Sequence, residues 1–223
     1  MLFRSAAMQP VRLAMFDCDG TLVDGQANIC RAMELAFDRD GLPPPPRAAI
    51  RRIVGLSLAE AIAVLAPGAD HQRLAADYRT IFRAMRDDGR LDDEPLFDGI
   101  AAAIEALAAA GWTLGVATGK SDRGLAHVLA RHGLADRFTT LQTADRHPSK
   151  PDPTMLLAGM AEAGATAAAT VMIGDTSFDM AMARAADVRA IGVAWGYHDA
   201  AELIEAGADA VAARPGDLPG LLA

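Results

Sequence analysis

The feature that most constrains the fold is an alternation of short apolar runs with helical patterns along most of the 223 residues. The apolar runs have the length expected of buried parallel strands. We expect strands near 13–16, 112–117, 138–141, 170–173, 190–194 and 208–212. The helical patterns separate them, near 99–111, 121–132, 153–163, 177–186 and 199–206. Strands that alternate with helices favour an α/β fold, in which a parallel sheet is covered by helices on both faces.

Residues 25–92 interrupt this alternation, because they contain helical patterns but no strand pattern. The helices are expected near 26–40, 57–65 and 71–88. The run Pro43–Pro46 favours a stiff connection between helices, with a binding site for a proline-recognising domain as the alternative. We therefore expect a core domain formed by 9–24 and 93–223, and an inserted α-helical cap domain formed by 25–92 that covers the active site.

Composition disfavours several classes of protein. Acidic residues outnumber basic ones, 29 to 21, so there is no basic footprint for DNA or RNA. The two cysteines do not make a disulfide framework, which favours a cytoplasmic location. No apolar run approaches the length of a membrane span, and the first eight residues lack the apolar stretch of a signal peptide. We expect residues 1–7 to be an extension before the first strand, and the protein to be a monomer or a homodimer.

Four segments place residues suited to phosphate chemistry at the ends of predicted strands. They are Asp17-Cys18-Asp19-Gly20-Thr21-Leu22-Val23-Asp24, Thr118-Gly119, Lys150, and Gly174-Asp175-Thr176-Ser177-Phe178-Asp179. Ligands of parallel sheets bind beyond the carboxyl ends of the strands, so we expect these segments to meet there. Together they supply carboxylates, a hydroxyl and an ammonium, which can hold Mg²⁺, attack phosphorus and stabilise a transferring phosphoryl group. The pattern indicates an enzyme.

These segments resemble the four motifs of the haloacid dehalogenase superfamily. The matching residues are Asp17-x-Asp-Gly-Thr-Leu-Val-Asp24, Thr118-Gly119, Lys150-Pro151-Asp152-Pro153 and Gly174-Asp175-x-x-x-Asp179. With the helical insert after the first motif, the chain is most similar to the phosphoglycolate phosphatase-like branch, over residues 11–213. The resemblance implies a Rossmann-like core, a four-helix cap that opens and closes, dependence on Mg²⁺ and an aspartyl-phosphate intermediate.

The resemblance also implies a role for each catalytic residue. Asp17 would be the nucleophile, since a carboxylate can attack phosphorus and form a covalent intermediate. Asp19 would donate a proton to the leaving oxygen and later take one from water. The Thr118 hydroxyl would bind a phosphoryl oxygen, and the Lys150 ammonium would neutralise both Asp17 and the phosphate. Each residue alone has an ordinary structural alternative, such as capping a turn or helix; the four segments together favour catalysis.

The metal site is expected to combine Asp17, Asp19, Asp175 and Asp179, with Asp19 contributing its backbone carbonyl. Mg²⁺ prefers oxygen ligands in octahedral geometry and retains some of its water. Asp179 lies one helical turn beyond Asp175, so both can reach the same point. The alternative for Asp175 is a simple helix cap.

Four further residues are expected to contact the substrate. Gly119 lies where a helix N-terminus can direct amide hydrogens at phosphate. Arg51, Arg52 and Ser57 lie between helical patterns of the cap, where the family places its specificity loop. An arginine there could bind a distal carboxylate or a second phosphate. The alternative is a solvated basic turn.

The implied activity is that of a Mg²⁺-dependent phosphatase of small phosphorylated metabolites, with phosphoglycolate as the leading substrate. A phosphomutase of the β-phosphoglucomutase type shares the same motifs and is the first alternative. A 2-haloacid dehalogenase is disfavoured, because displacement at carbon needs neither Mg²⁺ nor an acid such as Asp19. A non-catalytic binding protein of the same fold is the third alternative, against which the intact motifs argue.

Overall fold

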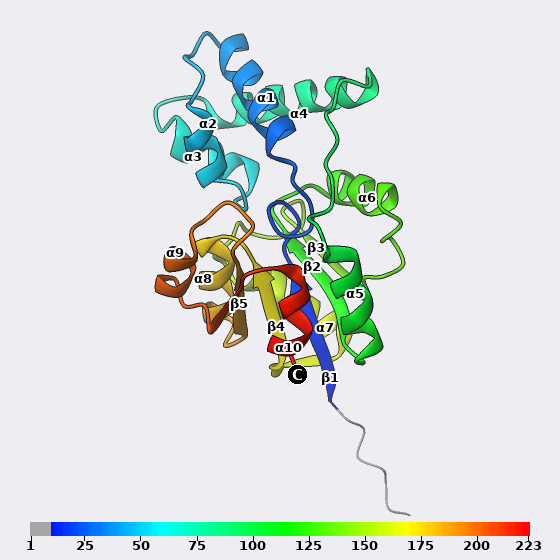
Figure 1. The fold of residues 1–223 in the computed structure, drawn as a ribbon. Coiled ribbons are helices and arrows are strands. Elements are labelled where there is room, and N and C mark those ends of the chain that lie inside the picture. The colour runs from blue at the N-terminus through cyan, green and yellow to red at the C-terminus, as the bar shows by residue number, and fades with distance from the viewer. Residues whose placement is uncertain (1–9) are drawn as a thin grey trace, which may run out of the picture.

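The computed structural model describes residues 10–223 (Figure 1), and the extension expected at 1–7 lies outside them. Within the described range, six parallel strands form one sheet in the order β3-β2-β1-β4-β5-β6. They are β1 (Val11–Phe16), β2 (Thr113–Thr118), β3 (Thr140–Thr143), β4 (Ala165–Gly174), β5 (Arg189–Val193) and β6 (Ala210–Ala212). The predicted parallel α/β fold is confirmed.

Two strands depart from their expected bounds. β3 begins at Thr140, because Phe138 instead packs edge-on against Phe16 in the core, with ring centroids 6.2 Å apart. β4 begins at Ala165, well before the apolar run that predicted it. Its added residues pair Ala165 with Val11 across an irregularity in the register. Backbone pairing, rather than an apolar pattern, extends this strand.

Helices cover both faces of the sheet. They are α5 (Ile100–Ala109), α6 (Asp122–Arg131), α7 (Thr154–Ala163), α8 (Ser177–Ala185), α9 (Ala200–Glu205) and α10 (Leu218–Leu221), with a 3₁₀ turn at Pro215–Asp217. Because side chains alternate along a strand, Ala14 and Phe16 of β1 face the apolar layer of α5, α6 and α10, whereas Leu13 and Met15 face that of α7 and α8. The turn and α10 were not predicted, since they are too short for a periodic pattern.

A group of four helices forms the cap, inserted after β1. They are α1 (Gln26–Arg39), α2 (Arg47–Arg52), α3 (Leu58–Leu65) and α4 (His71–Asp87). The cap has its own apolar cluster, which includes Met33, Phe37, Ile62 and Leu74. Figure 1 shows it beyond the carboxyl ends of the strands. The six-residue helix α2, which follows Pro46 directly, was not predicted. Across residues 10–223, every helix is too short or too polar to cross a membrane.

Two paired segments connect the cap with the core. The Asp24 N–H donates a hydrogen bond to the Pro95 carbonyl (3.0 Å), and the Phe97 N–H donates to Leu22 (3.1 Å). Asn28, in the first turns of α1, donates to the Glu94 carboxylate at 3.1 Å. These bonds hold the entry to the cap beside its exit, so both connections lie next to the end of β1.

Candidate active site

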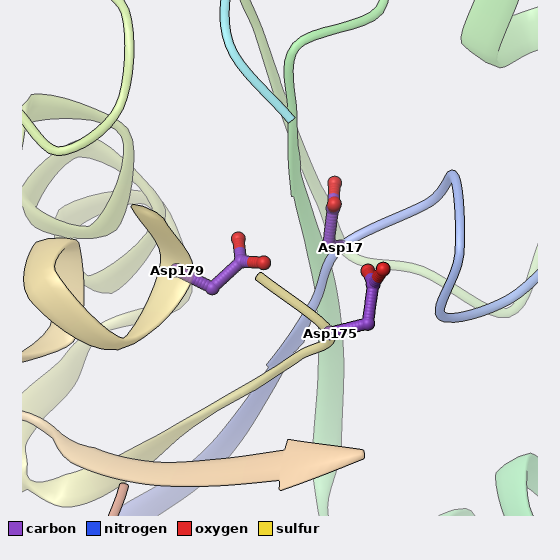
Figure 2. Close-up of side chains that lie close together, drawn as sticks. All are labelled: Asp17, Asp175 and Asp179. Atoms are coloured by element: carbon purple, nitrogen blue, oxygen red, sulfur yellow. The ribbon is translucent and has the colours of Figure 1, made fainter. Parts of the chain in front are cut away.

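The predicted catalytic and metal-binding residues converge at the carboxyl edge of the sheet. Asp17 follows β1, Thr118 ends β2, Lys150 lies in the loop before α7, Asp175 follows β4, and Asp179 lies in the first turn of α8. All five are buried. Figure 2 shows the carboxyl groups of Asp17 and Asp175 side by side, with Asp179 approaching from α8. Parallel strands bring these residues together although up to 162 positions separate them in the sequence.

Three carboxylates form a cluster that fits a divalent cation. One oxygen each of Asp17, Asp175 and Asp179 lies within 4.8 Å of the others. Asp175 accepts hydrogen bonds from the Thr21 hydroxyl and the Tyr197 N–H, both at 2.9 Å. Of the two Asp17 oxygens, Oδ1 lies 2.9 Å from Lys150 Nζ, and Oδ2 has no hydrogen-bond donor within residues 10–223. A buried carboxylate oxygen that lacks a donor needs a cation, and this all-oxygen set suits Mg²⁺.

The burial and crowding of these carboxylates raise the pKa of two of them. Burial raises the pKa of Asp17, against the attraction of Lys150. Burial also raises the pKa of Asp175, and the neighbouring charges of Asp17 and Asp179 raise it further. Both shifts follow from removing like charges from water. A bound cation would reverse them and keep the cluster ionised.

Lys150 provides one positive charge within this cluster. Its Nζ lies 2.9 Å from Asp17 Oδ1 and 2.6 Å from Asp179 Oδ1. Burial opposes the charge on Lys150, but the two carboxylates outweigh that effect and raise its pKa. The other Asp179 oxygen accepts hydrogen bonds from the Thr176 N–H and hydroxyl, at 3.0 and 2.7 Å. Lys150 is therefore a fixed cation beside the candidate nucleophile.

Asp19 lies apart from the three-carboxylate cluster. The tight turn after Asp17 continues through Gly20, whose φ of +84° favours glycine. A Cβ at Gly20 would also lie 2.1 Å from Asp175 Oδ2, so only glycine fits. The turn directs the Asp19 side chain to Lys120, whose Nζ lies 2.9 Å from Asp19 Oδ1. Burial raises the pKa of Asp19, which favours the protonated form that an acid requires.

Sequence reasoning missed Lys120 and Glu94. Lys120 Nζ lies 3.9 Å from Glu94 Oε2, and both residues are largely buried. Burial opposes the charge on Lys120, but Asp19 and Glu94 outweigh it and raise the lysine pKa. Lys120 could have been found from the sequence, because it directly follows the Thr118-Gly119 motif. No sequence pattern indicates Glu94, because its contact with Lys120 depends on how the cap connection folds.

Thr118 and Gly119 lie where the core meets the cap. The Thr118 hydroxyl accepts the Lys120 N–H at 3.2 Å, which leaves its own hydrogen free to donate. A Cβ at Gly119 would lie 2.4 Å from the carbonyl oxygen of Leu56 in the cap. Glycine at 119 therefore permits a close approach of cap and core. On the cap side, the Ser57 N–H donates to Ser149 Oγ at 2.7 Å.

Arg51 and Arg52 are not placed with the other site residues. The Arg51 guanidinium lies 5.7 Å from the ring centroid of Tyr197, and Arg52 pairs with Glu202 at 2.5 Å. Both contacts join the cap to the core, and neither arginine lines the cavity above Asp17. The sequence placed both arginines between helices, whereas they form the last turn of α2, and it could not show the direction in which they point.

A cavity of about 470 Å³ separates the cap from the core at this edge of the sheet. Asp17, Asp19, Thr118 and Lys120 line its core side, and Ser57 and Gly119 also contribute to its wall. The cap supplies a set of residues that sequence reasoning did not identify: Tyr78, Arg79, Phe82, Arg83 and Arg86 of α4. No motif marks them, and only the fold of the cap shows that they face the candidate nucleophile.

Comparison with known proteins identifies the family. A family model described as haloacid dehalogenase-like hydrolase matches residues 14–193, most of the chain. The chain belongs to this family. A haloacid dehalogenase-like hydrolase from Streptococcus pneumoniae has the same fold, with a TM-score of 0.83 at 22% identity over 96% of this chain and 99% of that one. The predicted resemblance is confirmed, as is the inserted helical cap as part of the fold.

Two curated relatives of this haloacid dehalogenase-like hydrolase indicate the class of enzyme. A Dickeya dadantii protein named "probable phosphatase IndB" is 38% identical over 199 residues, 86% of this chain and 84% of the relative. A phosphoglycolate phosphatase of Rhodospirillum rubrum is 34% identical over 194 residues, 83% of this chain and 80% of the relative. The predicted enzyme class, a phosphoric monoester hydrolase, is confirmed.

Proposed function

We propose that this hydrolase is a Mg²⁺-dependent phosphatase of small phosphorylated metabolites, acting through an aspartyl phosphate on Asp17. One observation carries the proposal. Asp17 is buried at the cavity wall, with Oδ1 2.9 Å from Lys150 Nζ and with Oδ2 lacking a hydrogen-bond donor within the described chain. A nucleophile needs such an oxygen, free of donors yet held in place.

In the first step, Asp17 attacks the phosphorus atom and displaces the alcohol of the substrate. Asp19, two residues away and oriented by Lys120, donates a proton to the departing oxygen. The Thr118 hydroxyl donates its free hydrogen to a phosphoryl oxygen, while Lys150 reduces the repulsion between Asp17 and the phosphate. In the second step, water attacks the acyl phosphate after Asp19 removes its proton, and free phosphate leaves.

The metal would be held by Asp17, Asp175 and Asp179, together with the backbone carbonyl of Asp19. When bound, Mg²⁺ neutralises charge on the phosphoryl group and orients it. Lys150 and the Thr176 contacts keep Asp179 in position for this role. The Tyr197 N–H and the Thr21 hydroxyl do the same for Asp175.

Hydrolysis is favoured over a mutase reaction. The cap loop in the cavity wall carries the apolar residues Ile53, Val54 and Leu56, and Ser57 is its hydroxyl-bearing residue. This loop has few groups that could bind the several hydroxyls of a sugar phosphate while it reorients. The names of the two curated relatives point the same way. Phosphoglycolate, named for the R. rubrum relative, is the first single substrate to test.

The deciding experiment measures phosphate release. p-Nitrophenyl phosphate with Mg²⁺ should be hydrolysed, EDTA should stop the reaction, and Mg²⁺ but not Ca²⁺ should restore it, because Ca²⁺ takes more ligands at longer distances. A screen of phosphorylated metabolites, ranked by kcat/KM, then orders the substrates. Rapid conversion of β-glucose 1-phosphate to glucose 6-phosphate with little free phosphate would instead establish a mutase, and absence of any turnover would leave a binding protein.

A further inference from the structure

Helix α4 turns one face toward the cavity. Tyr78, Arg79, Phe82, Arg83 and Arg86 all line it. Residues three or four positions apart lie on the same side of a helix, so this set is one continuous surface. It belongs to the cap, which lies beyond the carboxyl ends of the strands (Figure 1), whereas Asp17 follows β1 of the core. A molecule whose phosphate reaches Asp17 therefore has its alcohol part directed toward α4.

Of the three arginines on this face, Arg86 lies 3.4 Å from the Asp87 carboxylate, whereas Arg79 and Arg83 are not neutralised within residues 10–223. Within the described residues, neither Arg79 nor Arg83 has a carboxylate within ion-pair distance, although Arg73 on the same helix pairs with Asp40. Like charges four residues apart destabilise a helix. An arrangement with such a cost, in a chain whose net charge is −8, indicates an anion that arrives with the ligand.

A fourth arginine faces the same cavity from the core. Arg123 of α6 contributes to its wall and has no carboxylate partner among residues 10–223. Asp145 is a nearby acidic group of the wall, and its carboxylate already accepts the Asp122 N–H at 2.9 Å. The part of the cavity away from Asp17 and Asp19 is therefore positive. Guanidinium groups bind carboxylate and phosphate in two-pronged geometry.

The cavity is also larger and more apolar than a two-carbon acid requires. Its volume of about 470 Å³ lies in the range, roughly 300–1,000 Å³, of sites that enclose drug-sized molecules. Tyr78 and Phe82 stand with their ring centroids 5.8 Å apart, and Ile29 and Met33 of α1 complete an apolar wall. Phosphoglycolate would satisfy the charge but leave this wall without a contact.

We propose that α4 and Arg123 form a second anion-binding subsite, and that the preferred substrate is a phosphate monoester whose alcohol part joins an apolar or aromatic body to a distal carboxylate or phosphate. The apolar body lies against Tyr78 and Phe82, and the distal anion is bound by Arg79, Arg83 and Arg123. The inference rests on the proposed function, which places the reacting phosphate at Asp17.

Paired substrates test the subsite. 4-(Carboxymethyl)phenyl phosphate and its carboxamide differ in one charge far from the phosphate, and the carboxyethyl pair extends the spacer by one methylene. Hydrogen bonds to a charged group add about 1.5–3 kcal/mol, so at least one acid should exceed its amide about tenfold or more in kcat/KM. A ratio near one for both pairs would overturn the proposal.

Substitutions identify the residues responsible. In the double variant Arg79→Gln and Arg83→Gln, the ratio of kcat/KM for the acid to kcat/KM for the amide should fall toward one. The single change Arg123→Gln should also lower this ratio. Arg73→Gln is the matched control, because Arg73 lies on the same helix but pairs with Asp40 outside the cavity. An unchanged ratio in the double variant would contradict the proposal. Thermal unfolding should show that the double variant folds, since it loses only like-charge repulsion.

A binding measurement separates this inference from the proposed function. Calorimetry with the Asp17→Asn protein and Mg²⁺ should give tighter binding of the acid than of the amide, although no hydrolysis occurs. If the native enzyme hydrolyses no phosphate monoester, the proposed function fails, and the binding ratio still decides the subsite. If hydrolysis proceeds but neither the kinetic nor the binding ratio exceeds one, the subsite fails and the phosphatase proposal stands.

Discussion

The two lysines beside Asp17 and Asp19 in the core differ from two arginines on the cavity face of the cap in how their charge is balanced. In the core, Lys150 is buried and Lys120 is largely buried, and each lies between carboxylates within 4 Å. In the cap, Arg79 and Arg83 are exposed on the cavity face of α4 and have no carboxylate partner within the described residues. The core charges were desolvated when the protein folded, so they are preorganised for one reaction. The cap charges remain hydrated until a ligand binds.

This contrast assigns chemistry to the core and selection of substrate to the cap. Removing one partner of a buried ion pair costs about 3–5 kcal/mol, because the other charge is left without a partner. Even a solvent-exposed ion pair contributes a median of only about 0–1 kcal/mol. Substitutions in the core should therefore affect every substrate alike, whereas those on α4 should change the ranking of substrates.

The largest effect is expected from Asp17→Asn. The amide has the shape of the carboxylate but cannot form an acyl phosphate, so turnover of every substrate should fall to background while the fold persists. Phosphate release and thermal unfolding measure the two quantities. Asp98→Asn, an exposed change of the same type in the core, is the control. Retention of even a tenth of the native kcat would exclude the covalent mechanism.

A smaller loss is expected from Thr118→Ala. The Thr118 hydroxyl already accepts the Lys120 N–H, so its hydrogen is available to a phosphoryl oxygen. Losing one preorganised donor to a developing oxyanion lowers kcat by about 10²–10³, and we expect the lower end of this range for all substrates. Thr118→Ser keeps the hydroxyl and should stay near the native rate. If kcat is unchanged and only the melting temperature falls, Thr118 is purely structural.

The core of the site could be predicted because its signals are local. Asp17, Thr118 and Asp175 each follow a short apolar run, and a parallel sheet brings such strand ends to one edge. Lys150 and Asp179 were found through the family resemblance, and the fold places both beside Asp17.

The cap residues could not be predicted, because their roles depend on contacts between distant segments. Arg51 and Arg52 had the right charge, but they form the last turn of α2, which directs them toward Tyr197 and Glu202. Tyr78 and Arg83 showed only helical periodicity, which does not reveal whether a helix face meets solvent or a cavity. Helix α2 was missed for a related reason, since its six residues after Pro46 are stabilised mainly by packing.

His198 lies where the cap and the core meet, and it contacts both. Its Nδ1 accepts the Ser177 N–H of the core at 3.1 Å, and its Nε2 lies 3.2 Å from the Arg52 carbonyl of the cap. Only a neutral ring with its hydrogen on Nε2 satisfies both contacts. Burial accordingly lowers the pKa of His198.

The smallest effect is a pH-dependent loss of stability from this histidine. In the unfolded chain His198 takes up a proton below about pH 6.5, whereas in the folded protein it stays neutral to lower pH. The unfolded state then binds more protons, so the free energy of unfolding should fall as the pH drops below about 6.5 and be independent of this group above it. Denaturant titrations between about pH 5 and 8 measure the slope of the free energy of unfolding against pH.

His198→Asn keeps an acceptor near Nδ1 and should make this slope shallower, whereas His127→Asn, at an exposed position, should not. Equal slopes in the native and His198→Asn proteins would show that this contact between cap and core does not respond to pH.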